Sequence, residues 1–134
     1  MSLVFDTSAL VAILKAEPEA SAFADLLAAS RIYASSVTLF ELHCVAIRSA
    51  GIIDPQAAAS LLENLEISPV EFNAEQLDAA QIAYARYGRG TKHRAQLNMG
   101  DCFSYALART RNLPLLFKGD DFIHTDIVPA LKPA

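Results

Sequence analysis

The chain has 134 residues, of which 53% are hydrophobic and 19% are charged, so a folded domain with a sizeable core is expected and a disordered chain is excluded. The formal net charge of −4 excludes a uniformly basic surface as the means of holding a polyanion. No apolar run reaches the roughly 20 residues that span a bilayer, and the N-terminus lacks the basic flank of a signal peptide. We therefore expect one cytoplasmic domain that covers residues 1–134.

Short strands and helices alternate along the chain. Apolar runs predict strands at residues 3–5, 32–34, 67–72, 115–117 and 126–128, with Pro69 placing the third at an edge of the sheet. Capping residues, prolines and apolar stripes predict helices at residues 9–15, from Pro18 past Leu27, at 36–50, from Pro55 to about Leu65, from Asn73 to Gly88, and at 101–111. This order is typical of a three-layer α/β/α sandwich around a short, mainly parallel sheet.

Three acidic residues fall where such a fold gathers functional groups. Asp6 and Asp120 closely follow predicted strands, and Asp101 begins a helix. Right-handed crossovers place the strand ends along one edge, so these acids should share that edge. Each also has an ordinary structural explanation, as a helix cap for Asp6 and Asp101 and as part of a turn for Asp120.

Glu41 decides between these explanations. It lies in an apolar stretch from Val37 to Ile47, where it should be substantially buried. Arg48 is two helical turns away, too far for the usual pairing at three or four residues. Because an unpaired buried carboxylate is costly, a metal ion is the expected partner. Four acids brought together would form an oxygen-rich site for Mg²⁺ or Mn²⁺, and such a site indicates a metal-dependent nuclease.

Basic residues cluster in one short segment of this acidic chain. Arg86, Arg89, Lys92 and Arg94 fall within nine residues. Such a run is usually a solvated loop, but beside a nuclease site contact with RNA phosphates is the better interpretation.

The chain resembles the PIN-domain ribonucleases, in particular the VapC-type toxins of prokaryotic toxin–antitoxin pairs. The resemblance spans residues 3–128 and is carried, in order, by Phe5-Asp6-Thr7-Ser8-Ala9-Leu10, by Glu41, by the segment from Asn98 to Ala108, and by Leu116-Phe117-Lys118-Gly119-Asp120-Asp121-Phe122 with Thr125-Asp126.

The resemblance implies a PIN-like fold and a metal-dependent endoribonuclease that leaves 5′-phosphate and 3′-hydroxyl ends. It implies that Asp6, Glu41, Asp101 and Asp120 are the catalytic, metal-binding acids, with Asp120 favoured over Asp121. Thr7 and Ser8 would orient carboxylates or a bound water through their hydroxyls.

The resemblance also implies a small antitoxin protein and a second copy of the chain as partners. The first two helices are compatible with an interface, although core burial alone could explain their apolar residues: Leu10, Val11, Ile13, Leu14, Phe23, Leu26 and Leu27.

Two other classes of protein compete with this interpretation. A phosphoacceptor signalling domain would need paired acids after the first strand, whereas Thr7 follows Asp6. A non-catalytic PIN-like RNA-binding module is the stronger alternative, but the presence of all four acids argues for activity.

Overall fold

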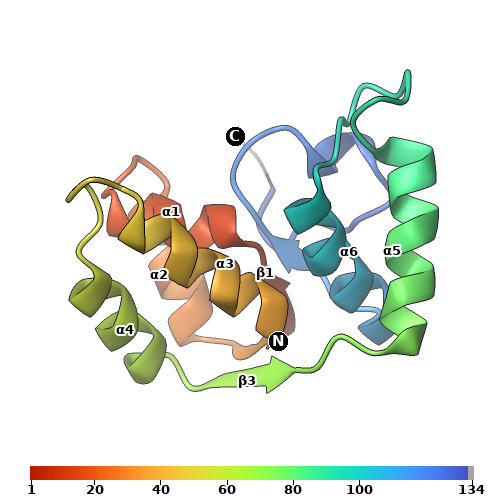
Figure 1. Ribbon diagram of the computed structural model, residues 1–134. Helices are drawn as coiled ribbons and strands as arrows, with labels where there is room; N and C mark the ends of the chain where they lie inside the picture. The colour runs from red at the N-terminus through yellow and green to blue at the C-terminus, as the bar shows by residue number, and fades with distance from the viewer. Residues whose placement is uncertain (133–134) are drawn as a thin grey trace.

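The computed structural model describes residues 1–132, which form a four-stranded parallel sheet between two layers of helices (Figure 1). The strands are β1 (Ser2–Phe5), β2 (Arg31–Ser35), β3 (Ile67–Val70) and β4 (Leu115–Leu116), in the order β3-β2-β1-β4. In this register Val4 of β1 lies opposite Tyr33 of β2 and Leu115 of β4. Because all pairs are parallel, the segments that leave β1, β2 and β4 emerge at the same edge.

The helices are α1 (Thr7–Leu14), α2 (Ala20–Ala28), α3 (Ser36–Ile47), α4 (Pro55–Asn64), α5 (Ala74–Tyr87) and α6 (Met99–Arg111), followed by the 3₁₀ helix η1 (Phe122–His124). Alternate strand residues face opposite layers, as the pleat of a strand requires. Leu3 and Phe5 pack with the helices α1 to α4, whereas Val4 packs with α5 and α6. The sheet therefore separates two apolar cores, and this confirms the predicted α/β/α sandwich.

Most predicted elements are present, with shifted ends. The α1 helix begins at Thr7 because Asp6 is its cap, and α3 ends at Ile47 instead of residue 50. Pro18 lies in the turn before α2 and not in its first helical turn. The strand β3 lies at an edge of the sheet, as Pro69 predicted. One domain covering residues 1–134 stays a prediction, since residues 133–134 lie outside the described range.

The predicted strand at residues 126–128 is wrong. On the side of β4 that faces away from β1, the pairing within residues 1–132 is an isolated bridge between Leu115 and Pro129. The chain is turned instead by Thr125, whose hydroxyl donates to the carbonyl of Phe122 at 2.7 Å and accepts from the amide of Ile127 at 3.2 Å. These local bonds compete with the extended conformation, and the short helix η1 just before them has no signal in the apolar pattern.

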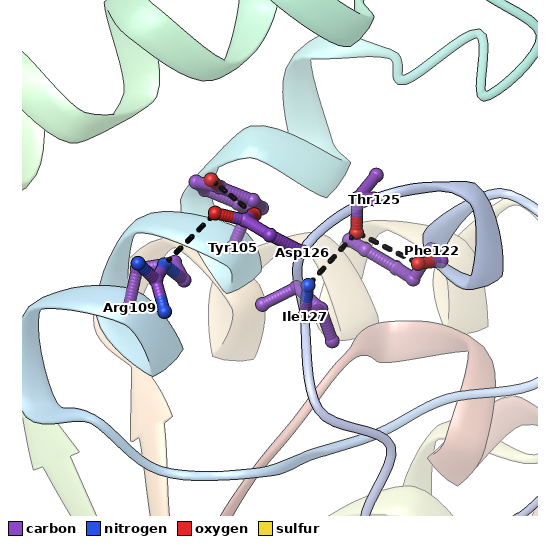
Figure 2. A network of polar contacts seen from close by, with 6 residues as sticks. All are labelled: Tyr105, Arg109, Phe122, Thr125, Asp126 and Ile127. Atoms are coloured by element: carbon purple, nitrogen blue, oxygen red, sulfur yellow. Dashed lines mark hydrogen bonds and ion pairs between the residues drawn. The ribbon is translucent and has the colours of Figure 1, made fainter.

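Asp126 ties this turn to α6 (Figure 2). Its carboxylate accepts from the hydroxyl of Tyr105 at 2.6 Å and pairs with Nε of Arg109 at 3.5 Å. Burial, with the hydrogen bond to Asp126, raises the pKa of Tyr105 above its usual range, so its hydroxyl keeps the proton that it donates. The segment that follows β4 is thus anchored to the helix that carries Asp101.

None of the helices within residues 1–132 has the length and apolar character needed to cross a membrane.

Candidate active site

Asp6 stands at the junction of β1 and α1, at the edge where the parallel strands end. Its Oδ2 accepts from the amide of Ser8 at 3.1 Å, and its Oδ1 accepts from the hydroxyl of Ser104 at 2.7 Å. The residue is 5% exposed. The cap geometry and the contact from α6 therefore fix a buried carboxylate at the sheet edge.

Asp101 is held by a reciprocal cap at the start of α6. Its carboxylate Oδ2 accepts from the amide of Asn98 at 3.0 Å, while its own amide donates to the side-chain oxygen of Asn98 at 2.8 Å. The residue is 8% exposed. The same carboxylate thus completes a helix terminus and belongs to the candidate site.

Glu41 reaches the site from α3. Its Oε1 accepts from the hydroxyl of Thr7 at 2.5 Å, and a Cβ on Gly100 would collide with its Oε2. The glycine therefore leaves the space in which this carboxylate lies. The expectation of substantial burial was too strong: Glu41 is half-buried, because α3 turns one side to solvent, with Phe40 66% and Ile47 62% exposed.

The two acids after β4 occupy different places. The charge and the side-chain hydrogen bonding of Asp121 both contribute to the raised pKa of Asp101. Asp120 is exposed and lines a hollow of about 400 Å³ together with Glu19, Phe117 and Lys118. Asp6 and Asp121 therefore each lie near enough to Asp101 to raise its pKa, Glu41 lies against Gly100, and Asp120 lines the hollow beside Lys118.

Burial and like charge make the site electrostatically strained. Burial is the largest cause that raises the pKa of Asp101 to about 7, followed by the charge of Asp6, and the Asn98 amide opposes them. The ion pairs within residues 1–132 join Arg109 to Asp126 and Lys118 to Glu17 and Glu19, so none reaches Asp6 or Asp101.

This donor set fits a hard divalent cation. Carboxylate oxygens are the ligands that Mg²⁺ and Mn²⁺ prefer, and a cation would offset the repulsion between Asp6 and Asp101. Among residues 1–132, no three His, Cys, Asp or Glu side chains are already gathered closely enough to hold a metal.

The hydroxyls next to Asp6 have separate contacts. Thr7 donates to Glu41, whereas Ser8 accepts from the backbone amide of Lys118 at 3.0 Å and so joins α1 to the chain after β4. Both contacts involve segments that carry site residues. Sequence reasoning missed Asn98 and Ser104, although their spacings of three residues from Asp101 placed them at its cap and on its helix face.

The basic residues lie at the end of α5 and in the loop that precedes α6. Arg86, Arg89, Lys92 and Arg94 are exposed at the end of α5 and in the loop that follows. That loop ends at Asn98, the cap of α6, and Nε of Arg94 donates to Nδ1 of His124 at 2.9 Å.

The PIN domain family model matches residues 3–128 of this α/β/α fold. The chain belongs to this family. Its relatives include Ribonuclease VapC30 of Mycobacterium tuberculosis, 43% identical over 133 residues that cover 98% of this chain and 100% of the relative. Ribonuclease VapC of Mycolicibacterium smegmatis is 43% identical over 126 residues, covering 93% and 97%.

Solved structures share the fold at lower identity. Mycobacterium tuberculosis VapC20, described as a Sarcin-Ricin loop cleaving toxin, gives a TM-score of 0.72 at 19% identity and covers 98% of this chain and 99% of its own. VapBC2 from Rickettsia felis, bound to a DNA fragment from its promoter, gives 0.71 at 19% identity, covering 96% of each chain.

In metal-free protein, Asp101→Asn should be more stable than wild type at alkaline pH. The amide keeps an acceptor for Asn98 but removes the charge that burial and Asp6 oppose. The pKa of Asp101 is about 7 in the folded protein against an ordinary value of 3.8, so the wild type loses stability as pH rises between these values. Above them the difference between the two proteins is constant. We expect a gap on the order of a few kcal/mol at about pH 8 and a clearly smaller one at about pH 5.

Urea unfolding in EDTA at both pH values measures this gap. The exposed acid of α5 supplies a matched control, Asp78→Asn, which should show no pH-dependent gain. A gap for Asp101→Asn that is equal at the two pH values would contradict the strain assigned to this carboxylate.

Proposed function

We propose that this protein is a divalent-metal-dependent endoribonuclease of the toxin type that acts in the cytoplasm. The observation that carries the proposal is the buried pair Asp6 and Asp101, which share the carboxyl edge of the sheet and have no cationic partner within residues 1–132. Family membership supports it, because curated relatives of nearly full length are named as ribonucleases.

The chain's own residues would hold Mg²⁺ or Mn²⁺ and position the RNA. Asp6, Asp101 and Glu41 supply carboxylate ligands, and Asp121 is a better candidate for the fourth than Asp120 because of its contact with Asp101. Such an ion, when bound, supplies a Lewis acid for phosphate oxygens and makes water more acidic. Thr7 and Asn98 keep their carboxylates oriented during the reaction. Attack of water at phosphorus with loss of the 3′ oxygen leaves 5′-phosphate and 3′-hydroxyl ends.

Cleavage of RNA by this chain should require Mg²⁺ or Mn²⁺ and should separate the two acids after β4. Asp101→Asn should reduce cleavage by at least about 100-fold, since it removes a ligand and its charge. Asp121→Asn should reduce cleavage more than Asp120→Asn, which serves as its matched control. The measurement is the rate of new 5′-phosphate ends in total RNA with Mg²⁺, Mn²⁺ or EDTA.

Metal-independent cleavage, or full activity in Asp101→Asn, would refute the nuclease site. No cleavage with any metal by folded wild-type protein would favour the non-catalytic RNA-binding module. A larger effect of Asp120→Asn than of Asp121→Asn would restore Asp120 as the fourth acid.

We propose that the exposed basic residues near the end of α5 contact RNA phosphates. The loop they occupy leads directly into the Asn98–Asp101 cap, so a strand held there would pass the acidic site. Replacing Arg89, Lys92 and Arg94 together by Gln should weaken RNA binding and reduce the slope of log affinity against log salt by about 2. Binding is measured with Asp101→Asn as the parent to prevent cleavage, and an unchanged salt slope would remove the proposal.

Two protein partners are proposed, an antitoxin and a second copy of the chain. The solved complex of VapBC2 supports the first by homology of fold. The residues that suggested an interface on α1 and α2 pack into the core beside the sheet, where their apolar character is accounted for. Exposed apolar side chains lie on α3 and also on α5 and α6, where Leu77 (45% exposed), Tyr84 (44%) and Met99 (73%) line one apolar hollow. This second surface is the one we assign to the homodimer.

Light scattering should give the mass of two chains at micromolar concentration. Leu77→Glu combined with Met99→Glu should give one chain, because two charges would be buried unpaired in the contact. Ile47→Glu with Ile52→Glu is the matched control, since both residues are exposed but lie in and after α3. A monomeric wild type, or equal effects of the two double variants, would contradict this assignment.

A further inference from the structure

Ser104 is a buried polar residue one helical turn beyond Asp101. It is 0% exposed, and its spacing of three residues places it on the same face of α6 as Asp101. Its hydroxyl lies 2.7 Å from Oδ1 of Asp6 and 3.3 Å from the hydroxyl of Thr38. A hydroxyl in this position is costly to bury unless it is bonded, so these two contacts account for its place in the core.

The direction of the hydrogen bonds follows from counting protons. An ionised Asp6 only accepts, so Ser104 uses its single proton on Asp6 and accepts from Thr38. Thr38 is 1% exposed and has Ser104 as its side-chain partner. The amide of Ser8 occupies the other oxygen of Asp6. Both oxygens of this carboxylate are therefore oriented by fixed donors.

The packing of α3 on α6 explains why this link is in the right place. Gly100 lies against Glu41, and Ser104 lies against Thr38, so α6 and α3 run antiparallel. The acids of the two helices therefore lie about one helical turn from the paired hydroxyls of Ser104 and Thr38. Ser104 thus connects Asp6 to the helix that carries Asp101. The bond holds together two carboxylates whose charges repel, and it does so from within the same rigid helix.

We propose that Ser104 is a positioning residue, which holds the carboxylate of Asp6 in the orientation where it and Asp101 can take one divalent cation together. This inference rests on the proposed metal-dependent function. A merely structural hydroxyl would affect stability alone, whereas a positioning hydroxyl also changes the affinity for the ion. Loss of a partner that orients a ligand typically costs 10- to 100-fold in metal affinity.

The test is calorimetric titration of Mn²⁺ into metal-free protein without RNA. Ser104→Ala should weaken binding by about tenfold or more, and Ser104→Cys should recover part of the loss because a thiol is a weak donor of similar size. Thr38→Val keeps the volume and leaves the bond from Ser104 to Asp6, so its binding should change by less than about threefold. Thr110→Ala is the matched control, since it removes a hydroxyl of α6 that bonds only to backbone carbonyls of that helix.

A second measurement follows RNA cleavage as a function of Mn²⁺ concentration. Ser104→Ala should need more Mn²⁺ for half-maximal cleavage and should recover rate when Mn²⁺ is raised.

The outcomes separate the two proposals. Wild type that binds no Mn²⁺ overturns the proposed function and this inference with it. If Ser104→Ala binds Mn²⁺ as tightly as the wild type and differs from it only by a lower melting temperature, the inference alone is overturned. If Ser104→Ala does not fold, Ser104→Cys decides, because a folded Cys variant with wild-type affinity and an unchanged Mn²⁺ requirement would equally overturn it.

Discussion

The repulsion between Asp6 and Asp101 is the constraint around which this structure is organised. Two carboxylates that are 5% and 8% exposed cannot stay charged side by side without donors that face them. The chain supplies those donors from its most rigid parts: the first amides of α1, the cap of α6 and a hydroxyl inside α6. The donors hold the acids in place but leave their charge unneutralised, which is the condition that favours a cation over a protein side chain as the missing partner.

The parallel sheet provides the frame on which these contacts depend. The chain leaves β1 at Asp6 and β2 at Ser35, which caps α3 through the amide of Val37 at 3.2 Å. Both following helices therefore start at the same edge, and α6 lies close enough to α3 that a Cβ on Gly100 would displace the carboxylate of Glu41. On the far side of β4, the bonds of Asp126 to Tyr105 and Arg109 fasten the segment behind Asp121 to α6 (Figure 2). The candidate site draws on four distant parts of the chain, and contacts made by residues next to each site residue hold these parts together.

Much of this could be predicted from the sequence because the relevant signals are local. The fold class follows from alternating apolar runs and caps, and Asp6 marks a helix start by residue type alone. What sequence could not supply is side-chain direction after β4, where Gly119, at φ +100°, turns the chain and two adjacent aspartates point to different places. Ser104 was missed for a related reason, since its partners Asp6 and Thr38 are 98 and 66 residues away. The false strand at 126–128 shows local turn bonds prevailing over apolar content.

Two acids of the candidate site also take part in helix caps, and this has an evolutionary consequence. Asp6 caps α1, where asparagine serves as well as aspartate, and an asparagine in place of Asp101 would keep an oxygen that accepts from the amide of Asn98. One nucleotide change converts an aspartate codon to an asparagine codon, so a lineage can silence this site in a single step without unfolding the chain. A silenced copy would keep the fold and every outer surface of the chain. The contacts that hold the site rigid therefore also allow its charge to be lost in one step while the fold remains.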